Sequence, residues 1–238
     1  MKIDKSFDHH VHIGQFYEDY FSPHKVIETL SNNGIKGCWF SSTTACVSWS
    51  NGSEKLYLKN HIMNEINEAL ESALKHEFDA RALYWMNLEE YLQVMDSEEM
   101  SIKDYFKEEI SRMDYFGIKV HTRLNYWDTN DEKVIKIFDI MCDYVNKGNM
   151  PILIHCGLDE CDRPDRFVNW FDKYKSVKFV LAHMRPVDTI IEMMKKYENV
   201  WTDTAFASNK SIERVFESGL GDRVLYGTDY PINREVYK

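Results

Sequence analysis

Short apolar runs alternate with longer amphipathic stretches along most of the chain. The runs have the length of β-strands, whereas the stretches between them repeat apolar residues every three or four positions, as helices do. This pattern predicts strands followed by helices. The eight expected strands are residues 7–12, 37–42, 80–85, 117–121, 151–155, 177–183, 200–203 and 223–229.

The stretches between the runs have recognisable helix ends. Residues 22–33 begin with Ser22 and Pro23 and stop before Gly34, an arrangement typical of a capped helix. In residues 54–76, apolar residues recur every four positions and predict one buried face. Further helices are expected at residues 88–115 with a break near Ser97, and at 130–148, 164–174, 186–197 and 210–217.

Strand and helix alternation predicts an α/β fold with a parallel sheet and right-handed crossovers. Eight units predict a single domain over residues 1–238, closed as a (β/α)₈ TIM barrel. An open doubly wound sheet is the alternative, but no glycine-rich phosphate loop follows the first strand. Few residues follow Asp229, so the eighth helix is expected to be short or absent. Another loop or a second subunit, as in a homodimer, should then cover that outer face.

Composition narrows the functional classes. The net charge of −10 argues against nucleic acid and anionic membranes as partners, and leaves a small-molecule substrate. The first residues contain no apolar signal segment, and no run is long enough to cross a membrane. The five cysteines are irregularly spaced and are expected to be reduced thiols in a cytoplasmic protein.

The first strand carries a cluster of histidines near residue 10. Asp8, His10 and His12 share one face of the strand because alternate side chains point the same way, whereas His9 faces the other side. Two imidazoles spaced in this way can converge on one metal ion at roughly 2.0–2.1 Å. Histidines packed in the core are the alternative interpretation.

Similar residues recur where later strands end. Barrel enzymes place their chemistry at the C-terminal ends of the strands, so these side chains should meet at one site. The residues at such positions are His10, His12, Lys119, His121, His155, His183 and Asp229.

Cationic and aromatic residues fall in the loops that follow the strands. Arginine binds carboxylates through two parallel hydrogen bonds, which makes Arg123 and Arg185, together with Lys119 and His121, candidates for binding an acidic substrate. Solvated surface arginines are the alternative. Four aromatic residues can either wall an apolar pocket or cap the barrel: Trp49, Trp85, Trp127 and Tyr230.

Several of these segments together resemble the amidohydrolase superfamily. The segments are Asp8-x-His10-x-His12-x-Gly14, Pro151 to His155, Phe179 to His183, and Leu225 to Pro231. The resemblance is strongest to the amidohydrolase-related (amidohydrolase 2) branch that includes aminocarboxymuconate-semialdehyde decarboxylase. It implies one divalent metal ion, zinc as a rule, held by His10, His12, His155 and Asp229, with His183 and Asp229 as the catalytic residues.

Three neutral imidazoles and one carboxylate leave a coordination position open for water. Metal-activated water then suits attack on an ester, lactone or amide of a small carboxylated substrate, which predicts a metal-dependent hydrolase. A non-oxidative decarboxylase of the same fold is the second hypothesis. A nuclease of the TatD type, which also begins with His-x-His, is disfavoured by the acidic charge.

Lys119 admits two roles. In some amidohydrolases a lysine on the fourth strand carries a carboxylate and bridges two metals, which here would involve Lys119, His155 and His183. The branch that the sequence resembles usually binds one metal. We therefore expect one metal per chain and an unmodified Lys119 directed toward an acidic group of the substrate.

Overall fold

The computed structural model describes residues 3–46, 53–97, 100–124 and 127–237. Its centre is one nine-stranded sheet in the order β2-β1-β3-β4-β5-β6-β7-β8-β9. All strands except β2 run parallel to their neighbours. The strands are β1 (Phe7–Phe16), β2 (Asp19–Phe21), β3 (Gly37–Ser42), β4 (Asp79–Trp85), β5 (Gly117–Val120), β6 (Ile152–Ile154), β7 (Phe179–Leu181), β8 (Val200–Asp203) and β9 (Val224–Leu225).

Backbone hydrogen bonds close the sheet between its last and first parallel strands. The amide of His9 donates to the carbonyl of Tyr226, and the amide of Asp229 donates to the carbonyl of His10, each at 2.8 Å. The amide of His12 also donates to the carbonyl of Tyr230 at 2.8 Å. The eight parallel strands therefore form the predicted (β/α)₈ barrel.

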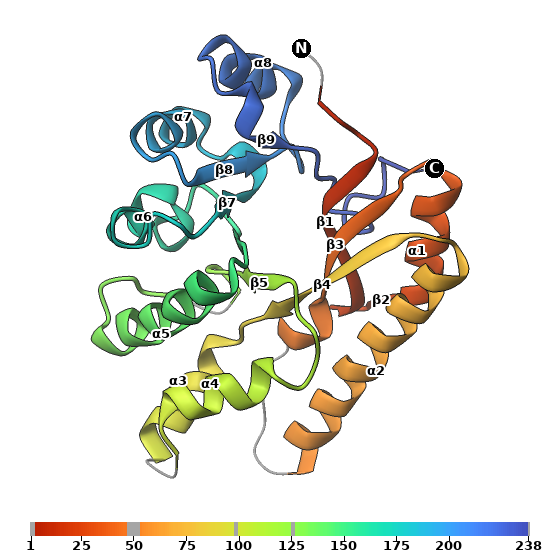
Figure 1. The fold of residues 1–238 in the computed structure, drawn as a ribbon, viewed down its shortest axis with the longest axis vertical. Coiled ribbons are helices and arrows are strands. Elements are labelled where there is room, and N and C mark those ends of the chain that lie inside the picture. The colour runs from red at the N-terminus through yellow and green to blue at the C-terminus, as the bar shows by residue number, and fades with distance from the viewer. Residues whose placement is uncertain (1–2, 47–52, 98–99, 125–126, 238) are drawn as a thin grey trace.

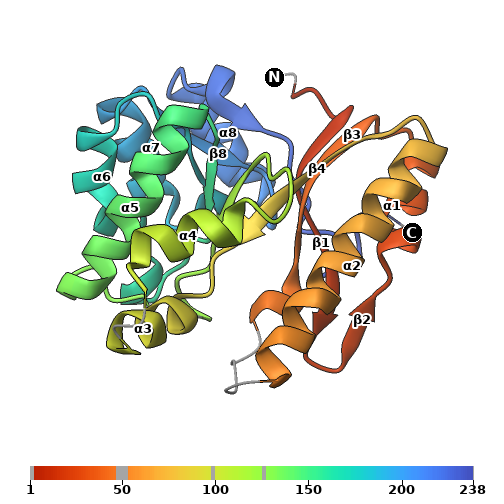
Figure 2. The ribbon, with the colours of Figure 1, turned by 60° about the horizontal axis from the view of Figure 1, so that its bottom comes forward.

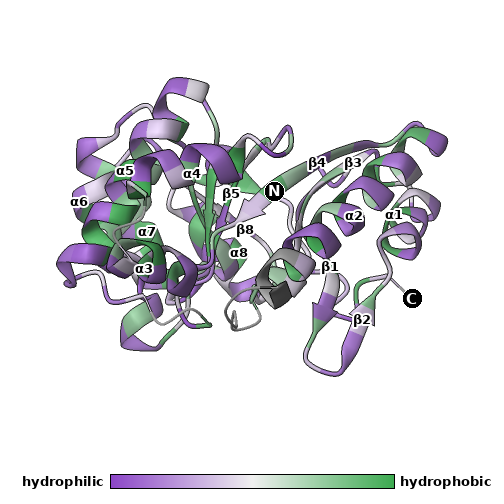
Figure 3. Ribbon diagram, turned by 90° about the horizontal axis from the view of Figure 1, so that it is seen from below, coloured by the Kyte–Doolittle hydropathy of each residue, from purple (hydrophilic) through white to green (hydrophobic). Residues whose placement is uncertain are grey.

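Helices surround this barrel. In Figures 1 and 2, α1 and α2 lie together outside β1, β3 and β4, and α3 to α8 cover the other side. Figure 3 shows that their hydrophobic faces turn toward the strands and their hydrophilic faces outward. The helices are α1 (Pro23–Asn32), α2 (Ser53–Lys75), α3 (Leu88–Ser97), α4 (Ile102–Ile110), α5 (Glu132–Gly148), α6 (Val168–Lys173), α7 (Val187–Lys196) and α8 (Asn209–Glu217).

Sequence signals at the helix ends explain several of these bounds. The carboxylate of Asp131 accepts hydrogen bonds from the amides of Lys133 and Val134 and so caps α5. The break predicted near Ser97 separates α3 from α4, which Ser101 caps. The segment after β6 contains two 3-10 helices, Glu160–Asp162 and Pro164–Phe167, before α6.

The last strands are shorter than expected: β7 covers only part of residues 177–183 and is followed by a 3-10 helix at Ala182–Met184, and β9 covers only part of residues 223–229. The first strand is longer than expected. β1 does not end at His12 but continues to Phe16 and pairs antiparallel with β2 as a hairpin. Gly14 permits this course, because its φ is +85° and a Cβ there would lie 2.5 Å from Oγ1 of Thr44.

The described residues after β9 form turns and contain no helix, as predicted. This segment folds back over the seam between β9 and β1. Tyr226, Tyr230 and Tyr237 pack against the apolar cluster of β1 and α1, and the Tyr237 hydroxyl donates to Oδ2 of Asp8 at 3.1 Å. The chain itself thus supplies cover for which we expected another loop or a second subunit, and a homodimer stays a prediction. Among the described residues, no helix is long and apolar enough to cross a membrane.

Candidate metal centre

The C-terminal ends of the parallel strands converge on a cavity of about 200 Å³. All the predicted site residues line it except Arg123. Arg123 is exposed and its Nε lies 3.1 Å from Oδ2 of Asp159. The lining residues are His10, His12, Phe16, Trp85, Lys119, His121, His155, His183, Arg185, Phe206, Asp229 and Ile232.

Three buried side chains at the base of the cavity offer atoms that could hold one metal ion: His10, His12 and Asp229. Oδ1 of Asp229 lies 2.9 Å from Nε2 of His12 and 3.5 Å from Nε2 of His10. This oxygen is buried and has no hydrogen-bond partner of acceptable geometry among the described residues. An orphaned carboxylate oxygen facing two imidazole nitrogens fits a divalent metal, and the mixture of nitrogen and oxygen donors suits zinc.

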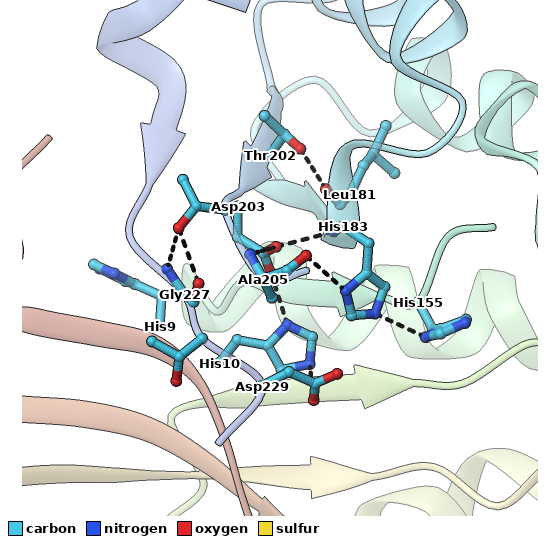
Figure 4. Close-up of polar contacts among 12 residues, drawn as sticks. His9, His10, His155, Leu181, His183, Thr202, Asp203, Ala205, Gly227 and Asp229 are labelled. Atoms are coloured by element: carbon cyan, nitrogen blue, oxygen red, sulfur yellow. Dashed lines mark hydrogen bonds and ion pairs between the residues drawn. The ribbon is translucent and has the colours of Figure 1, made fainter. Parts of the chain in front are cut away.

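The second ring nitrogen of His10 and of His12, Nδ1, contacts a side chain on the side away from Asp229. Nδ1 of His10 lies 2.8 Å from Oδ2 of Asp203, and Nδ1 of His12 lies 3.1 Å from Oγ of Ser41. Figure 4 shows His10 between Asp203 and Asp229, whereas His9 points away from this group. These contacts direct both Nε2 atoms to Asp229, in the manner of outer partners that orient metal-bound histidines.

The environment favours the protonation states that ligands need. Burial lowers the pKa values of His10 and His12, so both rings are neutral near neutral pH and keep a lone pair for a metal. Burial by itself would raise the pKa of Asp229, but the neighbouring His10 and His12 outweigh it and hold that pKa well below its usual value. The group therefore offers two neutral nitrogens and one anionic oxygen.

Asp203 is a site residue that the sequence analysis did not select. It is fully buried, and its Oδ1 accepts hydrogen bonds from the amides of His183 at 2.9 Å and Ala205 at 3.0 Å, while Oδ2 faces His10. Both oxygens are therefore engaged, so Asp203 orients its neighbours although it also lies within metal-binding distance of His10 and His183. Its position at the end of β8 was the signal that could have identified it.

His155 and His183 form a second pair beside these three residues. Nδ1 of His155 lies 3.0 Å from Nε2 of His183, and Nδ1 of His183 lies 3.1 Å from the carbonyl oxygen of Ala205 (Figure 4). His155 does not join the three clustered ligand atoms. Burial lowers the pKa of His183 to about 4, so its ring is neutral and able to accept a proton.

The remaining predicted residues line the walls. Lys119 is fully buried, its Nζ lies 3.0 Å from Nε2 of His10, and burial lowers its pKa to about 8. The ring of His121 stacks on that of His155 with centroids 3.8 Å apart. The exposed Arg185 donates to the carbonyl of Phe206 at 3.0 Å.

Of the four aromatic candidates, Trp85 lines the cavity. Trp127 is buried in the core against Phe138, and Tyr230 packs at the seam. Trp49 lies outside the described residues.

Comparison with known proteins bears on the family and the fold of the chain. A family model described as amidohydrolase (Amidohydro_2) matches residues 90–236, more than half of the chain. The match includes His155, His183 and Asp229 and begins after His10 and His12. No curated protein sequence matches the chain.

Two solved structures share the fold at low sequence identity. An amidohydrolase II has a TM-score of 0.61 at 15% identity, over 94% of this chain and 87% of that one. A 2,6-dihydroxybenzoate decarboxylase, solved with 2,6-dihydroxybenzoate, has a TM-score of 0.58 at 14% identity, over 98% of this chain and 89% of that one.

Proposed function

The chain belongs to the amidohydrolase family, and from that membership we propose that it is a metal-dependent hydrolase of a small carboxylated substrate with an ester, lactone or amide bond. The observation that carries the proposal is the buried Oδ1 of Asp229, which faces Nε2 of both His10 and His12 and has no hydrogen bond of acceptable geometry among the described residues. We propose zinc as the metal, one per chain, with His155 as the fourth ligand.

A metal bound by these residues supplies Lewis acidity and a water nucleophile near neutral pH. The chain's own groups do the rest. Asp229 is held ionised and can accept a proton from water at the site. His183 is neutral, is fixed through its Nδ1 and main chain, and can orient the reacting group or receive its proton. Lys119 and Arg185 supply positive charge for a substrate carboxylate.

A non-oxidative decarboxylase is the second candidate. Flat side chains form much of the cavity wall, since Trp85, His121 and Phe206 all line it and the ring of His121 stacks on Trp85 with centroids 5.7 Å apart. Such walls suit a planar ring as well as an acyl group. One of the similar folds is a decarboxylase.

Metal analysis tests the proposal directly. Protein purified without chelator should contain about one zinc per chain, and the double variant His10→Ala/His12→Ala should lose it. The control is His9→Gln, because His9 precedes His10 in the same strand but points away from the site. Full metal content in the double variant would place the metal elsewhere.

Activity assays then separate the two candidates. A panel of esters, lactones, amides and carboxylated aromatic acids should be incubated with the zinc-loaded protein. Release of an acid from an ester or lactone identifies the hydrolase, whereas release of carbon dioxide identifies the decarboxylase.

A further inference from the structure

The loop after β6 folds back onto its own first residues. The amide of Gly157 donates to the carbonyl of Asp162 at 3.0 Å, and the amide of Asp162 donates to the carbonyl of Asp159 at 3.1 Å. A Cβ on Gly157 would lie 2.3 Å from Oδ2 of Asp162. The absence of a side chain at residue 157 is therefore what lets the Asp162 carboxylate come this close to the strand end.

The carboxylate that this loop holds is buried without an obvious partner. Asp162 is 1% exposed, and its Oδ1 has no hydrogen-bond partner among the described residues. The nearby arginines pair with other acids, Arg123 with Asp159 and Arg163 with Asp165. Burying a carboxylate in this way is costly, so a compensating interaction is expected in the working protein.

The facing group is His155. Its Nε2 lies 3.9 Å from Oδ2 of Asp162, which is longer than a hydrogen bond, and no described residue is hydrogen-bonded to that nitrogen. Asp162 does not line the cavity, so it reaches the site only through His155.

The proton positions explain the long distance. The carbonyl of Ala205 can only accept, so Nδ1 of His183 carries a proton and Nε2 of His183 does not. In the metal-free protein His155 then donates a hydrogen bond from Nδ1 to Nε2 of His183. Nε2 of His155 is therefore unprotonated and faces the Asp162 carboxylate with its lone pair. The pair becomes complementary only when the proton of His155 is on Nε2, and that requires the lone pair of Nδ1 to be engaged by something else.

We propose that Asp162 is a positioning residue that holds His155 with its proton on Nε2, so that Nδ1 is free to bind the metal. This inference rests on the proposed function, because it takes His155 as a metal ligand. The site would then contain two histidines held by carboxylates, but through different ring nitrogens. Asp203 holds Nδ1 of His10, and Asp162 would hold Nε2 of His155.

Zinc binding to the chelator-treated protein tests the inference, measured in competition with a chromophoric chelator. Loss of such an outer partner typically weakens metal affinity 10–100-fold, and we expect Asp162→Asn to fall in roughly that range. The matched control is Asp159→Asn, which removes the same charge from the same loop at an exposed position that does not face His155. Gly157→Ala should weaken binding in the same direction as Asp162→Asn, since it displaces the carboxylate without altering it.

A second measurement needs no variant. Nitrogen-15 NMR of histidine-labelled, zinc-loaded wild type should show the proton of His155 on Nε2, the tautomer that the proposed contact with Asp162 requires. A proton on Nδ1, or an affinity of Asp162→Asn equal to that of Asp159→Asn, would overturn the inference while leaving the proposed function intact. Wild type that binds no zinc would overturn both.

Discussion

The Nζ atom of Lys119 lies 3.0 Å from Nε2 of His10, the nitrogen that also faces Asp229. A cation of the chain therefore sits beside the position proposed for a metal cation. Two like charges so close in a buried site repel each other strongly. When metal binds, the Lys119 ammonium must therefore move away or lose its proton.

Replacing this lysine separates the one-metal and two-metal hypotheses. We expect Lys119→Met to keep one zinc per chain and to bind it roughly tenfold more tightly, because a repulsive charge is gone, while turnover of a carboxylated substrate falls. Chelator competition and elemental analysis measure this, with the exposed Lys133→Met as control. Two metals in wild type and loss of both in the variant would instead indicate a carboxylated Lys119.

His183 should serve the reaction more than the metal. We expect His183→Ala to retain most of its zinc and to lose ~10²-fold or more in kcat, the usual scale for a general acid or base. The control is His24→Ala, because His24 is an exposed residue at the start of α1. An unchanged rate on an identified substrate would contradict the role assigned to His183.

Asp203→Asn should affect both metal binding and stability. The amide nitrogen must face either Nδ1 of His10 or the two main-chain amides, and each of these is a donor. We expect metal affinity to fall by roughly 10–100-fold. The unfolding free energy should fall by about 1–3 kcal/mol because a buried donor is left unpaired. Denaturant titration of the metal-free proteins isolates the second effect, and the exposed Asp222→Asn should change neither quantity.

Glu65 should make stability depend on pH. It is buried between the hydroxyls of Ser42 and Thr44, and burial raises its pKa above the usual value. The protonated form is therefore favoured by folding, so this contribution is complete below the unfolded pKa and is lost as pH rises through the folded pKa. Relative to Glu65→Gln, wild type should lose unfolding free energy as pH rises above about 4.3, the ordinary pKa of a glutamate. Parallel stability curves for the two proteins would contradict this prediction.

The closing segment should contribute measurably to stability. Tyr237→Phe removes the hydrogen bond to Oδ2 of Asp8 and the contact with the hydroxyl of Tyr226, and we expect it to lower the unfolding free energy by about 1–2 kcal/mol. Tyr17→Phe is the control, since Tyr17 is 77% exposed at the hairpin turn. Equal melting curves for the two variants would show that the segment does not secure the seam.

Much of the fold could be predicted because one rule, apolar strands separated by amphipathic helices, repeats through the chain. The same rule placed His155, His183 and Asp229 at one end of the barrel, since each follows a strand closely, and it placed His10 there although β1 continues beyond that residue. It could not predict the extension of β1 into a hairpin, because that depends on the space that Thr44 leaves for Gly14.

Side-chain partners were harder to predict than backbone positions. Asp203 is the last residue of β8 and His155 directly follows β6, yet the role of Asp203 depends on its contacts with His10, His183 and Ala205. Arg123 follows β5 as expected, but the nearby Asp159 binds it at the surface. Such pairings depend on loop conformation, which apolar periodicity does not describe.

The seam between β1 and β9 joins parts of the chain more than 200 residues apart, and the proposed ligands His10 and Asp229 lie on its two sides. Zinc held there would form a reversible cross-link between β1 and the segment after β9, where the barrel can open. Chelation should then speed hydrogen exchange first at the amides of His9, His12 and Asp229, while the interior strands stay protected. The stability of the barrel seam would thus depend on the supply of metal. Metal depletion would then lower the local stability of the protein as well as its activity.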